Sequence, residues 1–267
     1  RVDALREVQG EYAFLNEIDE IWSIGSTSKE WIEQTFTDPY ADLIKSTAYI
    51  TGNPFSNTLL GRRGRTEYGT THDTWIERDW VGKLVKDRLV DESDIGHIEP
   101  LWGDPEEHNW FDTQKPPSIT NHAIEAARSG RFDRVIAHYM QPHSPYYASS
   151  TEYDELEEYE LHPFKALKHG LESEEKVWDA YLDNLRYALD NIEVLLENVE
   201  GDVVITADHG ELLGDQGMYY HMPGNPHPKL KKVPWVRVEG KDERTVKPAI
   251  DLCGHEGAQE VSEEQLE

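Results

Sequence analysis

Four short apolar runs limit the folds open to this chain more than any other feature of its sequence. They are STAYITG at 46–52, RVIAHYM at 134–140, DVVITAD at 202–208 and VPWVRVEG at 233–240. Each has the character of a buried strand. Apolar residues also recur at three-and-four spacing from Trp178 to Leu196, which predicts one long amphipathic helix. This alternation predicts an α/β fold with a mostly parallel central sheet and helices on both faces.

The same pattern predicts a single domain over residues 1–240. A chain of 267 residues is long enough for one large α/β domain with a sizeable core. The segment at about 52–117 is rich in Gly, Asn, Arg and Trp, which indicates a loop-rich insertion that covers a substrate. Residues 241–267 lack clear periodicity, so we expect a polar C-terminal tail that wraps the surface or is partly disordered.

The net charge excludes some partners. The chain has 53 acidic and 26 basic residues, a formal net charge of −27, spread along its length. Such a surface repels polyanions, so we expect no nucleic-acid partner and no nonspecific binding to anionic lipid. A dense carboxylate surface also holds water and keeps proteins soluble in concentrated salt. The composition therefore favours a salt-adapted source over an acidic protein from an ordinary one.

Targeting signals are absent from the sequence. No apolar run approaches a membrane span, and no signal peptide is visible. Cys253 is the single cysteine, so it forms no internal disulfide, and nothing requires an oxidising compartment. We therefore expect a cytoplasmic protein. Because the chain opens on Arg1, we also expect both of its ends to be cut.

The third apolar run ends in Asp208, His209 and Gly210. Glycine lets the backbone turn sharply, so both polar side chains can face one point. Carboxylate and imidazole together suit a divalent metal, and this mixed ligation admits calcium, manganese or zinc. In the alternative interpretation, Asp208 caps the following turn and His209 packs, and other residues must decide.

Three further histidines lie in loops near predicted strands. His143 follows the second run, between Pro142 and Pro145, which stiffen the backbone. His221 and His227 lie in HMPGNPHPKL, a loop punctuated by glycine and proline. Each one alone is most simply an ordinary surface or packed histidine. Together, in one α/β chain, they indicate a catalytic or substrate-binding site.

The stretch GSTSKE at 25–30 places three hydroxyl residues before a helical pattern; they are Ser26, Thr27 and Ser28. Ser or Thr followed by an acidic residue in the first turn is typical of a helix N-cap. The same geometry can place a hydroxyl beside a metal at a helix amino terminus, where an alkoxide and an anion are both stabilised. The two interpretations are compatible.

These motifs resemble those of sulfatases and their relatives in the alkaline phosphatase superfamily. VVITADHGELLGDQG at 203–217 is similar to the family's signature, and PHSPY at 142–146 to its Pro-His-x-Pro-Tyr element. The helix AYLDNLRYALDNIEVLLENV at 180–199 matches the one before the metal strand. RVDALRE and VSEEQLE look like the segment after the family's first strand and its usual carboxyl end, so the resemblance covers nearly the whole chain. The acidity points to a haloarchaeal type.

The resemblance implies a metal-dependent hydrolase of sulfuric or phosphoric esters, with the metal activating a hydroxyl nucleophile. It makes Asp208 and His209 ligands of a divalent ion (Ca, Mn or Zn). It places Thr27 at the nucleophile, beside the metal, with Ser26 as the alternative because the register is ambiguous by one residue. Relatives add one or two aspartates from their first strand, which RVDALRE follows, so the ligand set of this chain is incomplete.

The resemblance also assigns histidines to the substrate. His143 falls on a substrate-contacting or proton-donating histidine. His221 lies where many relatives carry a lysine that contacts the sulfate or phosphate, and histidine can still donate there but titrates near neutrality. His227, on the same loop, is a further substrate-binding candidate.

Three functions follow from these assignments. The leading one is hydrolysis of a small-molecule or glycan sulfate or phosphate ester. Sulfatases carry Cys/Ser-x-Pro-x-Arg, whose first residue becomes formylglycine; STSKEW has neither the Pro nor the Arg, so an unmodified hydroxyl makes phosphoester chemistry plausible. The alternatives are a phosphoryl-headgroup transferase of the same superfamily and a non-catalytic relative that binds an anionic glycan. Membrane association and oligomeric state stay open.

Overall fold

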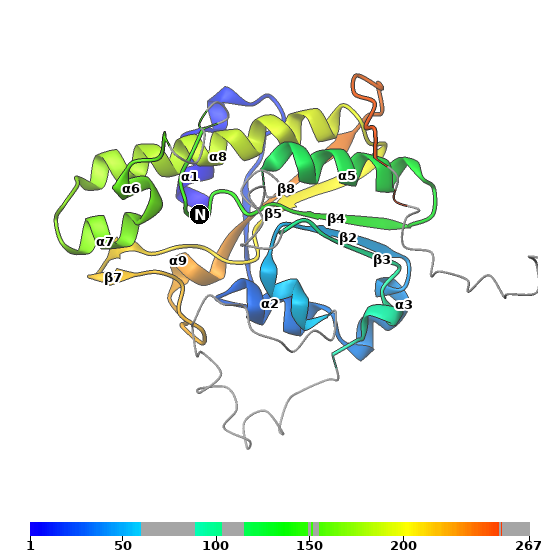
Figure 1. Cartoon of the computed structure of the whole chain (residues 1–267), viewed down its shortest axis with the longest axis horizontal. Coiled ribbons are helices and arrows are strands. Elements are labelled where there is room, and N and C mark those ends of the chain that lie inside the picture. The colour runs from blue at the N-terminus through cyan, green and yellow to red at the C-terminus, as the bar shows by residue number, and fades with distance from the viewer. Residues whose placement is uncertain (60–88, 103–114, 149–150, 152–154, 251, 253–267) are drawn as a thin grey trace, which may run out of the picture.

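The computed structural model describes residues 1–59, 89–102, 115–148, 151, 155–250 and 252 (Figure 1). Most of the predicted insertion at about 52–117 and most of the predicted tail at 241–267 lie outside the described residues. The division into one domain, an insertion and a tail therefore stays a prediction.

The described helices and strands alternate as the sequence predicts. The α-helices are α1 (Val2–Glu7), α2 (Ser28–Thr35), α3 (Ala41–Ile44), α5 (Pro116–Arg128), α6 (Glu158–Leu161), α7 (Pro163–Lys168), α8 (Glu174–Leu196) and α9 (Pro228–Lys231). The strands are β1 (Asp19–Trp22), β2 (Thr47–Thr51), β3 (His97–Pro100), β4 (Arg134–His138), β5 (Gly201–Thr206), β6 (Leu213–Asp215), β7 (Met218–Tyr219) and β8 (Lys232–Gly240). Short 3-10 helices lie at Gln9–Glu11, Asp38–Tyr40, Pro54–Thr58 and Glu92–Asp94.

The strands form two three-stranded sheets and a hairpin. One sheet, β3-β2-β4, is parallel throughout, as predicted. The other, β1-β8-β5, is antiparallel throughout, so the prediction of a mostly parallel sheet is wrong for this half. The reason lies in the connection after β5. It forms the β6–β7 hairpin and the single turn α9, and delivers β8 at the end where β5 stops, so that β8 runs back beside it.

Helices cover both faces of the parallel sheet (Figure 1). Because successive strand residues point to opposite faces, Ala48 and Ile50 of β2 pack with Ile119 of α5, whereas Tyr49 packs with Ile32 of α2. All five of these side chains are buried. This predicted feature is confirmed for β3-β2-β4.

Helix α8 lies along the antiparallel sheet and matches the predicted amphipathic helix. Its buried face packs Leu185 and Leu189 with Ile205 of β5 and Val236 of β8. Each such side chain stabilises the fold by roughly 1.5–3 kcal/mol when it is fully removed from water. The helix begins after Ser173, whose hydroxyl accepts from the Lys176 amide as an N-cap. No helix within the described ranges has the length and apolar content needed to cross a membrane.

Candidate functional site

Polar residues gather where β4 and β5 end. His138 is the last residue of β4, and Asp208 follows the end of β5. The His138 Nε2 atom lies 3.5 Å from the Asp208 Oδ2 atom. The other ring nitrogen, Nδ1, lies 2.7 Å from the hydroxyl of Tyr49, which is buried in the neighbouring strand β2. The two sheets therefore meet at a Tyr-His-Asp chain whose tyrosine is buried and whose other two members are partly buried.

Asp208 holds a buried carboxylate oxygen that no hydrogen bond uses. Its Oδ1 accepts from the His209 amide at 2.8 Å. Its Oδ2 is buried and has no hydrogen-bond partner among the described residues. Burial would raise the pKa of Asp208, but the His209 and His138 imidazoles hold that pKa well below its usual value. A buried, charged carboxylate oxygen whose neighbouring imidazoles lie no closer than 3.5 Å fits a bound cation.

His209 presents one ring nitrogen to a serine hydroxyl. Its Nδ1 lies 2.7 Å from the Gly210 carbonyl oxygen, which can only accept, so Nδ1 carries the proton. The lone pair of a neutral ring is then on Nε2, which lies 3.2 Å from the Ser28 Oγ. Burial lowers the pKa of His209, which keeps the ring neutral. This nitrogen can receive the hydroxyl proton or bind a metal beside it.

Gly210 is required by a close backbone contact. A Cβ atom at Gly210 would lie 1.9 Å from the Lys229 carbonyl oxygen. The Gly210 amide donates to the Leu230 carbonyl at 2.8 Å. The segment after β5 thus lies directly against α9, and the glycine of the Asp-His-Gly motif is explained by this approach.

The three hydroxyl residues before α2 occupy different positions. Thr27 is the N-cap, and its Oγ1 accepts from the Glu30 amide at 3.2 Å. The Ser26 hydroxyl donates to the Glu30 carboxylate at 2.7 Å. Ser28 is the hydroxyl that contacts His209. Thr27, one of the two nucleophiles predicted from the sequence, thus caps the helix, and the other, Ser26, contacts Glu30 and the Met222 carbonyl. Their catalytic role stays a prediction.

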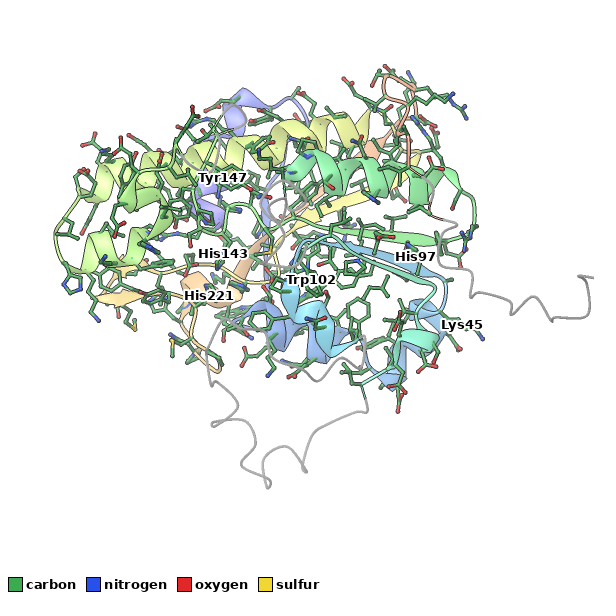
Figure 2. The ribbon with its side chains drawn as sticks, viewed as in Figure 1. Lys45, His97, Trp102, His143, Tyr147 and His221 are labelled. Atoms are coloured by element: carbon green, nitrogen blue, oxygen red, sulfur yellow. The ribbon has the colours of Figure 1, made fainter. Side chains whose placement is uncertain are left out.

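His143, Glu211 and His221 form a second group beside the first. Within the described part of the chain, this is the one set of three metal-ligating side chains whose ligand atoms all lie within 4.8 Å of one another. The His221 Nδ1 lies 2.8 Å from the buried Glu211 Oε2. The ring centroid of His221 is 5.3 Å from that of His143 and 4.4 Å from that of His209, so the two groups are continuous. Figure 2 shows the labelled His143 and His221 close together.

The pKa values of the three members of this second group shift in different directions. Burial would raise the pKa of Glu211, but His221 beside it lowers that pKa below its usual value. Burial would lower the pKa of His221, but the Glu211 carboxylate raises it above the usual value. Burial lowers the pKa of His143, so this ring stays neutral. The site then holds two carboxylates, Asp208 and Glu211, with His221 as the histidine whose pKa is raised.

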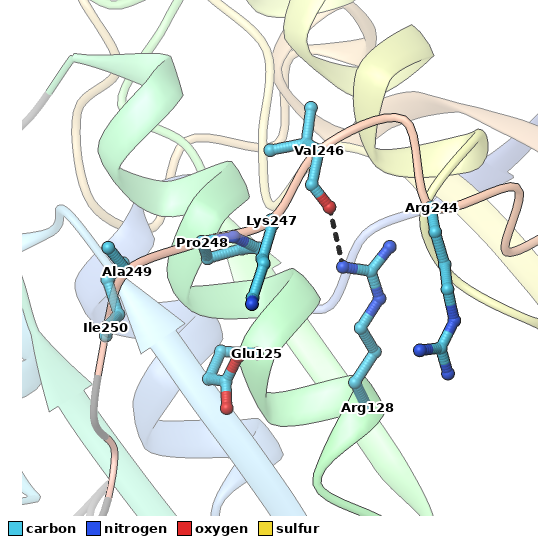
Figure 3. Close-up of a pocket in the computed structure, with 8 residues that line it drawn as sticks. All are labelled: Glu125, Arg128, Arg244, Val246, Lys247, Pro248, Ala249 and Ile250. Atoms are coloured by element: carbon cyan, nitrogen blue, oxygen red, sulfur yellow. Dashed lines mark hydrogen bonds between the residues drawn. The ribbon is translucent and has the colours of Figure 1, made fainter.

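Two other features lie apart from these groups. His227 is the N-cap of α9, where its Nδ1 accepts from the Lys229 amide at 3.2 Å, a position at the start of a helix and outside both groups. A cavity of about 640 Å³ lies between α5 and residues 244–250 (Figure 3). Its Arg128 is bound to Asp242 and to the Val246 carbonyl, and none of the site residues lines it.

The sequence alone missed three members of this site, which are His138, Glu211 and Ser28. Ser28 was noted only as a hydroxyl near a helix start, and not as the contact of His209. His138 lies inside the predicted strand run, and Glu211 directly follows Asp208-His209-Gly210. His138 and Glu211 are both polar residues at or just beyond the carboxyl end of an apolar strand, and this position was the signal that could have found them.

Comparisons with known proteins give structural matches alone. No protein-family model and no curated protein matches the chain. The fold is similar to the C-terminal periplasmic domain of phosphoethanolamine transferase EptC from Campylobacter jejuni, with 14% identity, a TM-score of 0.48, and coverage of 86% of this chain and 70% of that one. It is also similar to the soluble domain of lipooligosaccharide phosphoethanolamine transferase A from Neisseria meningitidis, with 16% identity, a TM-score of 0.48, and coverage of 94% and 72%.

Proposed function

We propose that this chain is a metal-dependent enzyme that acts on phosphoric esters through a hydroxyl at the amino end of α2. The single observation that carries the proposal is the 3.2 Å contact between Ser28 Oγ and His209 Nε2, which itself lies 3.6 Å from the Asp208 Oδ2 atom. Ser28 is the first residue of α2, so the helix dipole stabilises negative charge at this point. The arrangement joins a hydroxyl, a neutral imidazole and a carboxylate, as activation of a nucleophile requires.

The residues present fit a divalent metal. The Asp208 carboxylate and the Ser28 hydroxyl would hold one, and Glu211 and the neutral His143 ring offer further donors. The single lone pair of His209, on Nε2, is then free to receive a proton. Two carboxylates in the site would repel a phosphate, so a cation is also needed for substrate to enter. When bound, the metal supplies positive charge that lowers the pKa of a nearby hydroxyl and stabilises phosphoryl oxygens.

The chain's own residues account for the rest of the reaction. The Ser28 oxygen forms a bond to phosphorus while the ester P–O bond breaks, and the hydroxyl proton passes to His209 Nε2. The departing alkoxide takes a proton from protonated His221, 2.8 Å from Glu211, which stabilises its charged form. An acceptor hydroxyl then forms a bond to phosphorus and gives its proton to His221, while the bond between phosphorus and the Ser28 oxygen breaks and that oxygen takes back a proton from His209.

The acceptor decides between the two versions of this reaction. Water gives hydrolysis, which is the leading prediction from the sequence, and an alcohol gives transfer of a phosphoryl headgroup. Both use the same nucleophile. An unmodified serine favours phosphate over sulfate, because the phosphoserine can be released by a second attack on phosphorus.

The test compares three hydroxyl variants with 4-nitrophenyl phosphate and with a phosphodiester of ethanolamine, in the presence of Zn²⁺ or Mn²⁺. We expect Ser28→Ala to lose at least about 100-fold in kcat, because a nucleophile is removed. Thr27→Ala should chiefly lower stability, by about 1 kcal/mol, because it removes an N-cap. Ser26→Ala should leave the nucleophile in place.

Adding glycerol as an acceptor alcohol separates transfer from hydrolysis, because only transfer yields a glycerol-phosphoryl product.

The outcomes also cover the other assignments. If Thr27→Ala is the inactive variant and Ser28→Ala is active, the nucleophile is the one predicted from the sequence and our choice of Ser28 is wrong. If the wild-type protein binds the metal but turns over neither phosphate nor sulfate esters, the catalytic proposal fails and the glycan-binding alternative remains.

A further inference from the structure

We infer that Glu30 is a positioning residue that holds the His221 loop against the nucleophile turn. By the His221 loop we mean residues 221–225, and by the nucleophile turn residues 25–28. The inference deepens the proposed function and rests on it for its kinetic consequence. The contact itself can be tested without any activity.

Both carboxylate oxygens of Glu30 are occupied. Its Oε2 accepts from the Ser26 amide and from the Ser26 hydroxyl, each at 2.7 Å. Its Oε1 accepts from the Gly224 amide at 2.7 Å. One carboxylate therefore binds three donors, two in the nucleophile turn and one in the His221 loop. Hydrogen bonds to a charged acceptor are shorter and stronger than those between neutral groups.

A second contact joins the same two segments. The Ser26 hydroxyl lies 3.0 Å from the Met222 carbonyl oxygen, one residue after His221. The single hydroxyl proton of Ser26 is shared between the Glu30 carboxylate and the Met222 carbonyl. The two segments are thus connected through Ser26 with Met222 and through Glu30 with Gly224. The segments are almost 200 residues apart in the sequence, so no local structure supplies this connection.

Helix capping alone does not account for Glu30. In a capping box, the acidic residue at the third helical position accepts from the backbone amide of the N-cap residue. Here the N-cap is Thr27, but the Glu30 side chain accepts from Ser26 instead. The bond to Gly224 adds nothing to the helix end. The bond between Glu30 and Gly224 instead holds the His221 loop against the nucleophile turn.

The positions that result are the ones the reaction uses. Ser28 is the last residue of the nucleophile turn and contacts His209, whose ring centroid lies 4.4 Å from that of His221. On its far side, His221 is held by Glu211. Glu30 therefore fixes the separation between Ser28 and His221, while Glu211 fixes the orientation of the His221 ring. Small displacements between reacting groups cost large factors in rate.

The test uses Glu30→Gln, which keeps the side chain's size, with Glu33→Gln as its matched control. The amide of glutamine offers one acceptor oxygen, so its NH₂ group must face a backbone N–H of Ser26 or of Gly224. Glu33 lies on the same helix, and its substitution removes the same charge. We expect kcat to fall by about 10–100-fold for Glu30→Gln, as for other groups that orient a site residue, and to stay within about twofold for Glu33→Gln.

A double variant separates positioning from a general structural effect. If Glu30 acts through the His221 loop, Glu30→Gln combined with His221→Ala should be no slower than His221→Ala alone. If the two losses multiply instead, Glu30 does not act through His221 and the inference is overturned.

Hydrogen exchange gives a readout that needs no turnover. The Gly224 amide should exchange faster in Glu30→Gln than in the wild type, and at an unchanged rate in Glu33→Gln. Unchanged exchange in Glu30→Gln would overturn the inference. Faster exchange in a protein without esterase or transferase activity would keep the Glu30 contact and reject the proposed function.

Discussion

At the scale of single residues, Asp208 is the side chain whose surroundings are least complete without a cation. Its buried Oδ2 has no hydrogen-bond partner among the described residues. We therefore expect Zn²⁺ to stabilise the fold, by about 2.7 kcal/mol at a concentration 100 times its Kd. For a chain of this size that is roughly 5–10 °C in Tm. In Asp208→Asn, which lacks the charged ligand, most of this shift should disappear.

Thermal unfolding with and without EDTA measures the effect. Asp202→Asn is the matched control, because Asp202 is an exposed residue of β5, the strand that leads to Asp208. Equal metal-induced shifts in both variants would mean that zinc binds the acidic surface generally rather than at Asp208.

His221 should show a pH dependence that Glu211 sets. In the metal-free protein, Glu211 raises the pKa of His221, whereas burial alone would lower it. The contact therefore stabilises the fold fully below the unfolded pKa of about 6.5 and loses this contribution as the pH rises through the folded pKa. The difference in unfolding free energy between wild type and Glu211→Gln should shrink over that range. NMR titration of the His221 ring should give a midpoint above 6.5 in the wild type and below it in Glu211→Gln.

The residues of this site were partly predictable from sequence. Asp208, His209, His143 and His221 were found because each follows an apolar run or lies in a rigid loop, and the structure brings their side chains together. Glu30 could be assigned only to a helix start. Its bond to Gly224 depends on two segments meeting in space, and no spacing in the sequence encodes that meeting.

At the scale of elements, α8 does more than cover a sheet. Asn184 is fully buried on this helix, and its Nδ2 donates to the carbonyls of His143 and Pro145 at 3.0 and 3.4 Å. Asn184→Ala leaves two partly buried carbonyls without this donor, which should cost about 1–3 kcal/mol. Urea unfolding measures the loss. In Asn191→Ala, where the side chain donates to Tyr187 one turn back in the same helix, we expect a change within about 0.5 kcal/mol. Equal losses would show that Asn184 acts only as a helix residue.

Elements with a strong burial pattern were predicted well, and those without one were missed. The runs for β2, β4, β5 and β8 and the spacing for α8 all depend on apolar side chains that enter the core. All four residues of β1 are exposed, so Asp-Glu-Ile-Trp carries no alternation to recognise. The direction in which strands pair could not be predicted from the sequence, because an apolar run has the same composition whether it pairs parallel or antiparallel.

At the scale of the whole molecule, the acidic excess should make stability depend on salt. If every basic residue paired with one acidic residue, 27 acidic residues would still have no basic partner. Their mutual repulsion acts over about 10 Å at 0.1 M salt and about 3 Å at 1 M. Screening should therefore favour the compact state, and we expect the Tm of the EDTA-treated protein to rise by several degrees between 0.1 and 2 M KCl.

The choice of salt decides what this last measurement means. Sulfate would stabilise almost any protein by being excluded from its surface, so chloride is the informative anion, and NaCl should act much as KCl does if screening is the cause. A salt-adapted protein should gain most of its stability below about 1 M, where the Debye length changes fastest. A Tm that stays level or falls would mean that the ion pairs of the fold, such as Arg186 with Glu11, outweigh the repulsion. The chain would then be an acidic protein of the ordinary kind.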